Sequence, residues 1–148
     1  MLNANDPASW NILLVDDDTD NRTVLAHIMR FYDATVTDLP SGGDALNSLE
    51  KWAGFNLVLL DLQMPAVDGW MVLKAMRSHA NPLLQTVPII AITAHAMHGD
   101  REKGLAAGFN GYLIKPVDPF TLLEDITKIL IALNKESSHE PHPESSAS

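Results

Sequence analysis

The 148-residue sequence contains no cysteine, which excludes disulfides, zinc–thiolate sites and thiol chemistry. Basic residues are scarce: 10 Lys and Arg stand against 19 Asp and Glu, so the formal net charge is −9. That charge disfavours unaided binding to nucleic acid or to an anionic membrane, because both would repel the protein. No apolar run approaches the ~20 residues of a membrane span, and residues 1–9 lack the basic and apolar segments of a signal peptide. We therefore expect a cytoplasmic protein without direct nucleic-acid or membrane contacts.

One apolar stretch organises the rest of the chain. Residues 57–60 are four apolar residues without polar alternation, and they run directly into Asp61. Such a run is typical of a strand buried on both faces, as in a parallel sheet. Asp61 then lies at the carboxyl end of a central strand, where open α/β sheets bind ligands. A carboxylate there is costly to keep ionised without a cation or hydrogen-bond donors, so we interpret Asp61 as the reactive group.

The remaining sequence alternates strand and helix patterns within one domain. Further strands are expected at residues 11–15, 34–38, 87–92 and 111–114, and helices at 20–32, 41–52, 68–76, 99–107 and 118–133. This order predicts an α/β fold with a five-stranded parallel sheet, wound doubly, and five helices on its two faces. We interpret residues 79–85 as a connecting loop, residues 1–9 as an N-terminal extension, 10–134 as the domain and 135–148 as a disordered tail.

Polar side chains follow four of the five expected strands, and parallel strands bring these ends to one edge of the sheet. They are Asp16 and Asp17, Asp61, Thr93, and Lys115. Two like charges ~5 Å apart cost roughly 3 kcal/mol at an effective dielectric of 20. A hard divalent cation such as Mg²⁺ removes that cost and prefers oxygen ligands. We therefore predict a magnesium site at this edge, to which the backbone carbonyl of Gln63 would add a ligand.

The same residues suit phosphoryl transfer. With the cation in place, Asp61 can attack phosphorus and form an acyl phosphate. The metal and Lys115 would carry charge on the transferring oxygens, and Thr93 would donate a hydrogen bond to one of them. Taken singly, each residue has an ordinary alternative: the acids as a solvated turn or helix cap, Thr93 as a locally bonded hydroxyl, Lys115 as a surface lysine.

Four motifs connect these residues to a known family. The chain carries, in this order, Leu14-Val15-Asp16-Asp17, then Leu60-Asp61 followed by Met64-Pro65 and Asp68-Gly69, then Ile92-Thr93-Ala94, and finally Gly111-Tyr112-Leu113-Ile114-Lys115-Pro116. Through these motifs residues 10–133 resemble the receiver domain of two-component response regulators. The resemblance implies a flavodoxin-like fold with strand order 2-1-3-4-5. It also implies that a sensor histidine kinase or a histidine phosphotransfer protein phosphorylates Asp61.

The resemblance also implies individual roles. Asp17, Asp61 and the Gln63 carbonyl would bind Mg²⁺ directly, and Asp16 through water. Thr93 and Tyr112 would form a conformational switch, although the sequence alone allows plain packing for Tyr112. The Lys115-Pro116 bond would be cis, and His95 and Gln63 would set the rate of dephosphorylation.

After the fifth strand the chain has room for one helix and a tail, so we expect a stand-alone signalling module and not an enzyme. Output would come from an unknown protein partner on the fourth helix, fifth strand and fifth helix. Three alternatives stay open. An aspartate-nucleophile phosphohydrolase needs an acid where Gln63 stands. A phosphorylation-independent binding module would be favoured if a site residue were missing. A flavodoxin-type nucleotide-binding protein would need a glycine-rich loop after the first strand.

Overall fold

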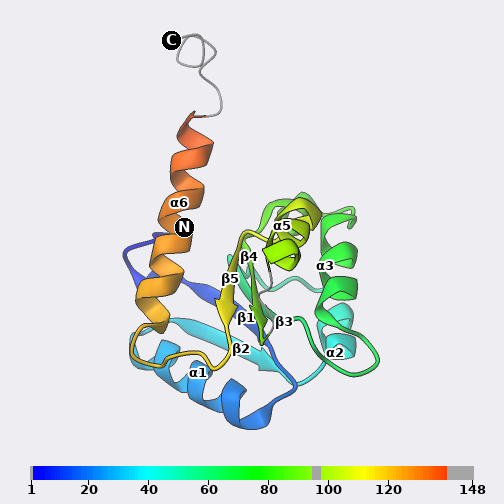
Figure 1. Cartoon of the computed structure of the whole chain (residues 1–148), viewed down its shortest axis with the longest axis horizontal. Coiled ribbons are helices and arrows are strands. Elements are labelled where there is room, and N and C mark those ends of the chain that lie inside the picture. Colours follow the sequence, from blue (N-terminus) through cyan, green and yellow to red (C-terminus); the bar gives the residue numbers. More distant parts are fainter. Residues whose placement is uncertain (1, 95–97, 140–148) are drawn as a thin grey trace.

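The computed structural model describes residues 2–94 and 98–139, which form a central sheet with helices on both sides (Figure 1). The elements, in chain order, are η1 (Pro7–Ser9), β1 (Asn11–Val15), α1 (Thr19–Phe31), β2 (Thr35–Leu39), α2 (Gly42–Asn47), β3 (Leu57–Asp61), α3 (Gly69–Arg77), α4 (Pro82–Thr86), β4 (Ile89–Thr93), α5 (His98–Ala107), β5 (Gly111–Ile114) and α6 (Leu122–His139).

The five strands are all parallel and lie in the order β2-β1-β3-β4-β5, as predicted. Every residue of β3 and β4 is buried, because these strands have neighbours on both sides and helices on both faces. The unbroken apolar runs of the sequence are therefore those of strands inside a doubly covered sheet. Their shared direction places the carboxyl ends of all five strands on one edge.

Each face of the sheet has its own apolar core. On one face, alternate strand residues such as Ile12 and Leu59 pack against Leu25 and Met29 of α1 and Ile126 of α6. The other face packs against α2, α3 and α4, whose buried side chains are Ala45, Val72, Leu73, Met76 and Leu84. Alternation along a strand sends successive side chains to opposite faces, so both cores draw on the same strands.

The segment interpreted as a connecting loop contains a short helix, so that expectation is wrong for α4. Asn81 caps this helix by accepting a hydrogen bond from the N–H of Leu83 at 3.0 Å, and Pro82 takes the first helical position. An Asn-Pro pair supplies both start signals of a helix, and the completely buried Leu84 anchors the turn to the core. The other five α-helices lie in the expected segments, but α2 is shorter than predicted and α6 begins at Leu122 rather than at residue 118. The short helix η1 was not predicted.

The two ends of the chain add to what the sequence indicated, and at the C-terminal end the structure differs from the expectation. The indole N–H of Trp10 donates to the carbonyl of Asn3 at 2.8 Å, and Ala4 is buried in the core, so the N-terminal extension packs against the domain. Helix α6 runs to His139, so residues 135–139 are helical rather than part of the expected tail. An existing helix gains a hydrogen bond with each added residue, and this favours its extension. Residues 140–148 lie outside the described part of the chain. Within the described part, no helix is both long and apolar enough to cross a membrane.

Candidate functional site

The predicted site residues lie where β1, β3, β4 and β5 end. Asp16 and Asp17 follow β1, Asp61 closes β3, Thr93 closes β4, and Lys115 follows β5. The N–H of Lys115 donates to the carbonyl of Thr93 at 2.8 Å, which joins the last two positions directly. Asp16, Asp61 and Thr93 are the buried polar residues of the described chain, with exposed fractions of 0%, 1% and 2%.

Three carboxylates and one ammonium meet at this edge. One oxygen from each of Asp16, Asp17 and Asp61 can be chosen so that all three lie within 4.8 Å of one another. The ammonium of Lys115 lies 3.0 Å from Oδ2 of Asp61 and 3.5 Å from Oδ1 of Asp16. The lysine cancels only part of the negative charge, and Asp17 is exposed to solvent. An oxygen-lined, net anionic cluster open to solvent fits a hard divalent cation.

The first turn of α1 supports the acid pair after β1. The side-chain amide of Asn21 donates to Oδ2 of Asp16, and the backbone N–H of Asp18 donates to Oδ1 of Asp16 at 2.9 Å. The guanidinium of Arg22 donates to the backbone carbonyl of Asp16 at 2.7 Å. Asp18 caps α1 by accepting a hydrogen bond from the N–H of Asn21 at 3.1 Å. The orientation of Asp16 is therefore set by donors from the following turn.

Asp61 is held by the loop that follows it. The N–H of Gln63 donates to Oδ1 of Asp61 at 3.0 Å. Helix α3 begins directly against this strand end, where a Cβ on Gly69 would lie 2.4 Å from the carbonyl oxygen of Asp61. Only glycine allows this close approach. Asp68 caps α3 by accepting a hydrogen bond from the N–H of Met71 at 3.0 Å.

The cluster shifts the pKa of its members in ways that follow from burial and charge. Burial raises the pKa of Asp61 to about 6, and the neighbouring Asp16 adds to the rise. The N–H of Gln63 and the ammonium of Lys115 oppose it only in part. Burial alone would lower the pKa of Lys115, but its hydrogen bond to Asp61 and the charge of Asp16 outweigh burial and raise it. Lys115 is therefore fully charged at neutral pH. Keeping Asp61 ionised in the folded protein costs free energy.

Comparison with known proteins assigns the chain to a family. Residues 12–127 match the model of the response regulator receiver domain. The chain belongs to the receiver domain family. An uncharacterised 14.6 kDa protein of Leptolyngbya boryana is 38% identical over 125 residues, which cover 84% of this chain and 93% of that protein. Sensor protein GacS of Pseudomonas syringae pv. syringae is 34% identical over 118 residues, which cover 79% of this chain but only 13% of GacS.

Solved receiver domains have the same fold. The receiver domain of sensor histidine kinase PA1611 from Pseudomonas aeruginosa PAO1, solved with a magnesium ion in its active site cleft, superposes with a TM-score of 0.68. It is 36% identical, over 79% of this chain and 93% of that one. The receiver domain of Ssk1 from Saccharomyces cerevisiae, solved with the histidine phosphotransfer protein Ypd1, gives a TM-score of 0.68 at 29% identity, over 80% and 86% of the two chains.

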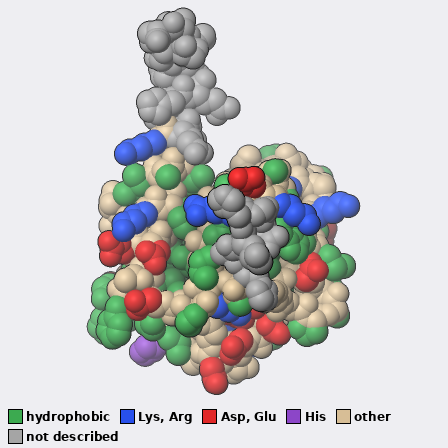
Figure 2. Space-filling view, viewed as in Figure 1, with side chains coloured by type: hydrophobic (Ala, Val, Ile, Leu, Met, Phe, Trp, Pro, Cys, Tyr) green, Lys and Arg blue, Asp and Glu red, His purple; other side chains and the backbone are tan. Residues whose placement is uncertain are grey.

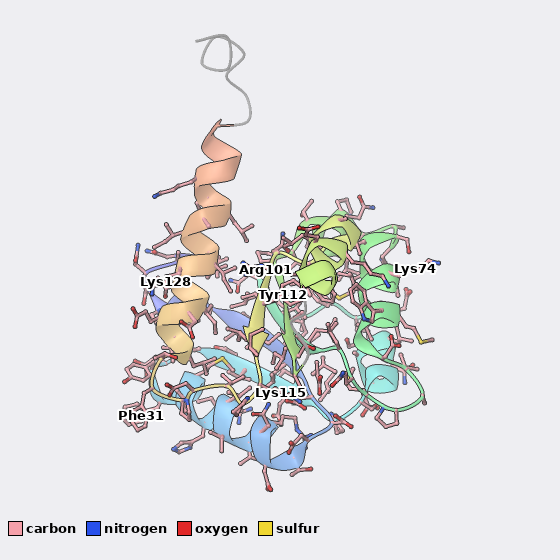
Figure 3. All side chains as sticks on the ribbon, in the orientation of Figure 1. Phe31, Lys74, Arg101, Tyr112, Lys115 and Lys128 are labelled. Atoms are coloured by element: carbon pink, nitrogen blue, oxygen red, sulfur yellow. The ribbon has the colours of Figure 1, made fainter. Side chains whose placement is uncertain are left out.

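The receiver's expected switch residue, Tyr112, is half-buried between β5 and α5 (Figure 3). A Cβ on Gly104 of α5 would lie 1.3 Å from the hydroxyl oxygen of Tyr112, so the tyrosine occupies the space that this glycine leaves. Its ring packs on Phe109 with centroids 6.0 Å apart, and Phe109 meets Trp70 edge-on at 5.4 Å. Gly104 therefore has a packing role, because it leaves room for the tyrosine.

The sequence predictions for the site divide clearly. The gathering of Asp16, Asp17, Asp61 and Lys115 is observed, and the Lys115-Pro116 bond is cis as expected. The donors Asn21 and Arg22 were missed, although their places in the first turn after an acidic strand end carried a signal. His95 lies outside the described residues. The metal role of the Gln63 carbonyl and the switch role of Tyr112 stay predictions.

Proposed function

We propose that this receiver domain accepts a phosphoryl group on Asp61 from a sensor histidine kinase or a histidine phosphotransfer protein, with Mg²⁺ as cofactor. The observation that carries the proposal is a buried carboxylate at a strand end, paired with an ammonium at 3.0 Å and grouped with two more acids. Such a cluster of buried charges does not stabilise the fold. Its presence is therefore best explained by a function that uses these charges. The magnesium-bound PA1611 receiver and the Ypd1–Ssk1 complex support the choice of cofactor and donor.

The side chains suggest how transfer proceeds. A carboxylate oxygen of Asp61 attacks phosphorus, and the bond from phosphorus to the donor's imidazole nitrogen breaks, with its electron pair leaving on the imidazole. Lys115, already 3.0 Å from Asp61, donates to a phosphoryl oxygen as negative charge moves outward. The Thr93 hydroxyl donates to a second oxygen. Mg²⁺, held by Asp17, Asp61 and the Gln63 carbonyl, with Asp16 through water, would supply further charge neutralisation.

Phosphorylation would then be read by other proteins. Tyr112 packs against Gly104 of α5, so a movement of Tyr112 coupled to Thr93 would alter the surface formed by α5, β5 and α6. We propose this surface for output, with phosphorylation biasing an existing equilibrium. The proposed setting is the cytoplasm, with protein partners rather than nucleic acid or membrane, in keeping with the net charge of −9. In this role the domain catalyses only its own phosphorylation and dephosphorylation.

The test is phosphoryl uptake from a small acyl-phosphate donor labelled with ³²P. The wild type should be labelled only with Mg²⁺, and Asp61→Asn should not be labelled. Asp20→Asn, an exposed acid in the first turn of α1, is the matched control and should be labelled normally. Labelling of Asp61→Asn would mean that another residue is the nucleophile. If neither protein is labelled, a phosphorylation-independent binding module becomes the better account.

A second measurement tests the metal site. Asp17→Ala should weaken Mg²⁺ binding, measured by calorimetry, at least tenfold, and Asp20→Ala should not. Equal affinities in the two variants would contradict the proposed ligands. Continuous release of phosphate from external monoesters would instead favour a phosphohydrolase. We do not expect it, because the exposed Gln63 stands where such an enzyme needs an acid to protonate the leaving group.

A further inference from the structure

Two exposed phenylalanines far apart in the sequence line the same surface groove. The chain has four phenylalanines. Phe55 and Phe109 are buried, whereas Phe31 is 74% and Phe120 97% exposed. Phe31, the last residue of α1, and Phe120, just before α6, line one groove of about 310 Å³. The other lining residues are His27, Tyr32 and Pro119, with Ile28 and Leu123, which also pack against the core. We call Phe31, Tyr32, Phe120 and this groove the aromatic patch.

The aromatic patch contributes little to the core. Helix α1 packs against the sheet through Leu25 and Met29, and α6 packs through Leu122 and Ile126. Figure 2 shows a cluster of hydrophobic side chains at the lower left of the molecule, where Figure 3 labels Phe31. Grouped exposed aromatic rings are expensive to hydrate, and such clusters mark interaction sites.

The charges beside the aromatic patch are negative and uncompensated. Asp33 follows Tyr32 on the α1 side and Asp118 precedes Pro119 on the α6 side; both are exposed. Neither forms an ion pair with a described residue. The basic residue next to Phe31 in the sequence is already engaged, because Arg30 lies 3.1 Å from Asp38.

From this combination we infer that the aromatic patch docks an amphipathic helix of a partner protein, with large apolar anchors and Lys or Arg residues on their flanks. The anchors would enter the groove between Phe31 and Phe120, and the basic flanks would face Asp33 and Asp118. A second copy of this chain is a poor occupant, because it would bring the same acids and a further net charge of −9 to the interface. An anionic membrane is disfavoured for the same reason. The inference does not depend on phosphorylation of Asp61.

The test uses displayed peptides, since it asks which helix chemistry the patch selects. A phage library of 18-residue helices varies the anchor positions among Leu, Ile, Met and Phe, and the flanks among Lys, Gln and Glu. It is selected on the full chain at 0.15 M salt. The expected winners carry Lys on the flanks and bind, by fluorescence anisotropy, at least tenfold more weakly to the double variant Phe31→Ser/Phe120→Ser. Leu83→Ser, another exposed apolar residue, is the matched control and should bind normally.

Further variants separate charge from apolar contact. Asp33→Asn/Asp118→Asn should reduce the preference for Lys over Glu flanks at least fivefold. The variant Phe31→Ser/Phe120→Ser should still take up phosphoryl like the wild type, so failure here is distinct from failure of the proposed function. Winners that bind the double variant equally well, winners with Glu flanks, or no winners at all would overturn the inference. So would a wild-type dimer in sedimentation that the double variant loses, because the occupant would then be a second copy.

Discussion

Replacing Asp61 by asparagine should stabilise the metal-free protein at neutral pH. Burial raises the pKa of Asp61 from 3.8 to about 6, so the folded state holds its proton over a range in which the unfolded chain has released it. Ionisation of this carboxyl therefore lowers the free energy of unfolding. The loss grows as the pH rises above about 4 and is complete above about pH 6. At about 1.4 kcal/mol per pH unit, the rise corresponds to about 3 kcal/mol. An asparagine keeps an oxygen that can accept from the Gln63 N–H or Lys115 and has no charge to desolvate.

The assay is urea unfolding followed by tryptophan fluorescence, from pH 4 to pH 8 with a chelator present. The free energy of unfolding of Asp61→Asn should exceed that of the wild type by up to about 3 kcal/mol above pH 6.5. The gain should shrink to about 0.5 kcal/mol at pH 4, where the carboxyl is protonated in the folded state and only partly ionised in the unfolded chain. Adding Mg²⁺ at pH 7.5 should stabilise the wild type and not the variant. A variant that is less stable at pH 7.5, or a gain that does not change with pH, would refute this account of the buried charge.

Three further predictions concern the scaffold. Burial tends to raise the pKa of Asp38, but its two arginine partners, Arg22 and Arg30, lower it overall. Asp38→Asn should therefore lower the free energy of unfolding by about 1 kcal/mol at pH 7. This loss should fade as the pH drops below 4, which thermal unfolding at a series of pH values would show. Gly104→Ala should cost about 1–3 kcal/mol in urea unfolding, because the new Cβ displaces Tyr112, whereas Gly43→Ala, with no atom nearer than 3.9 Å, should not destabilise. Deleting residues 1–9 should cost about 2 kcal/mol or more by exposing a buried indole; an unchanged midpoint would show that this segment only rests on the surface.

The sequence by itself determined the fold and most of the candidate site. Unbroken apolar runs mark strands with neighbours on both sides, and right-handed crossovers between such strands leave few arrangements. Asp61 and Lys115 could be placed together without coordinates, because parallel strands all end at the same edge of the sheet. A residue's position along its strand therefore decided its place in the site.

Only the tertiary structure decided which side chains touch. That Asn21 donates to Asp16, that Tyr112 fills the space left by Gly104, and that Phe31 and Phe120 line one groove all depend on helix rotation and packing. Apolar periodicity shows that a helix has a buried face, but it does not show whether a second apolar residue on that helix finds cover. The exposed aromatic rings and the packed N-terminal segment were hidden for this reason, since burial is a property of what surrounds a residue and not of the residue itself.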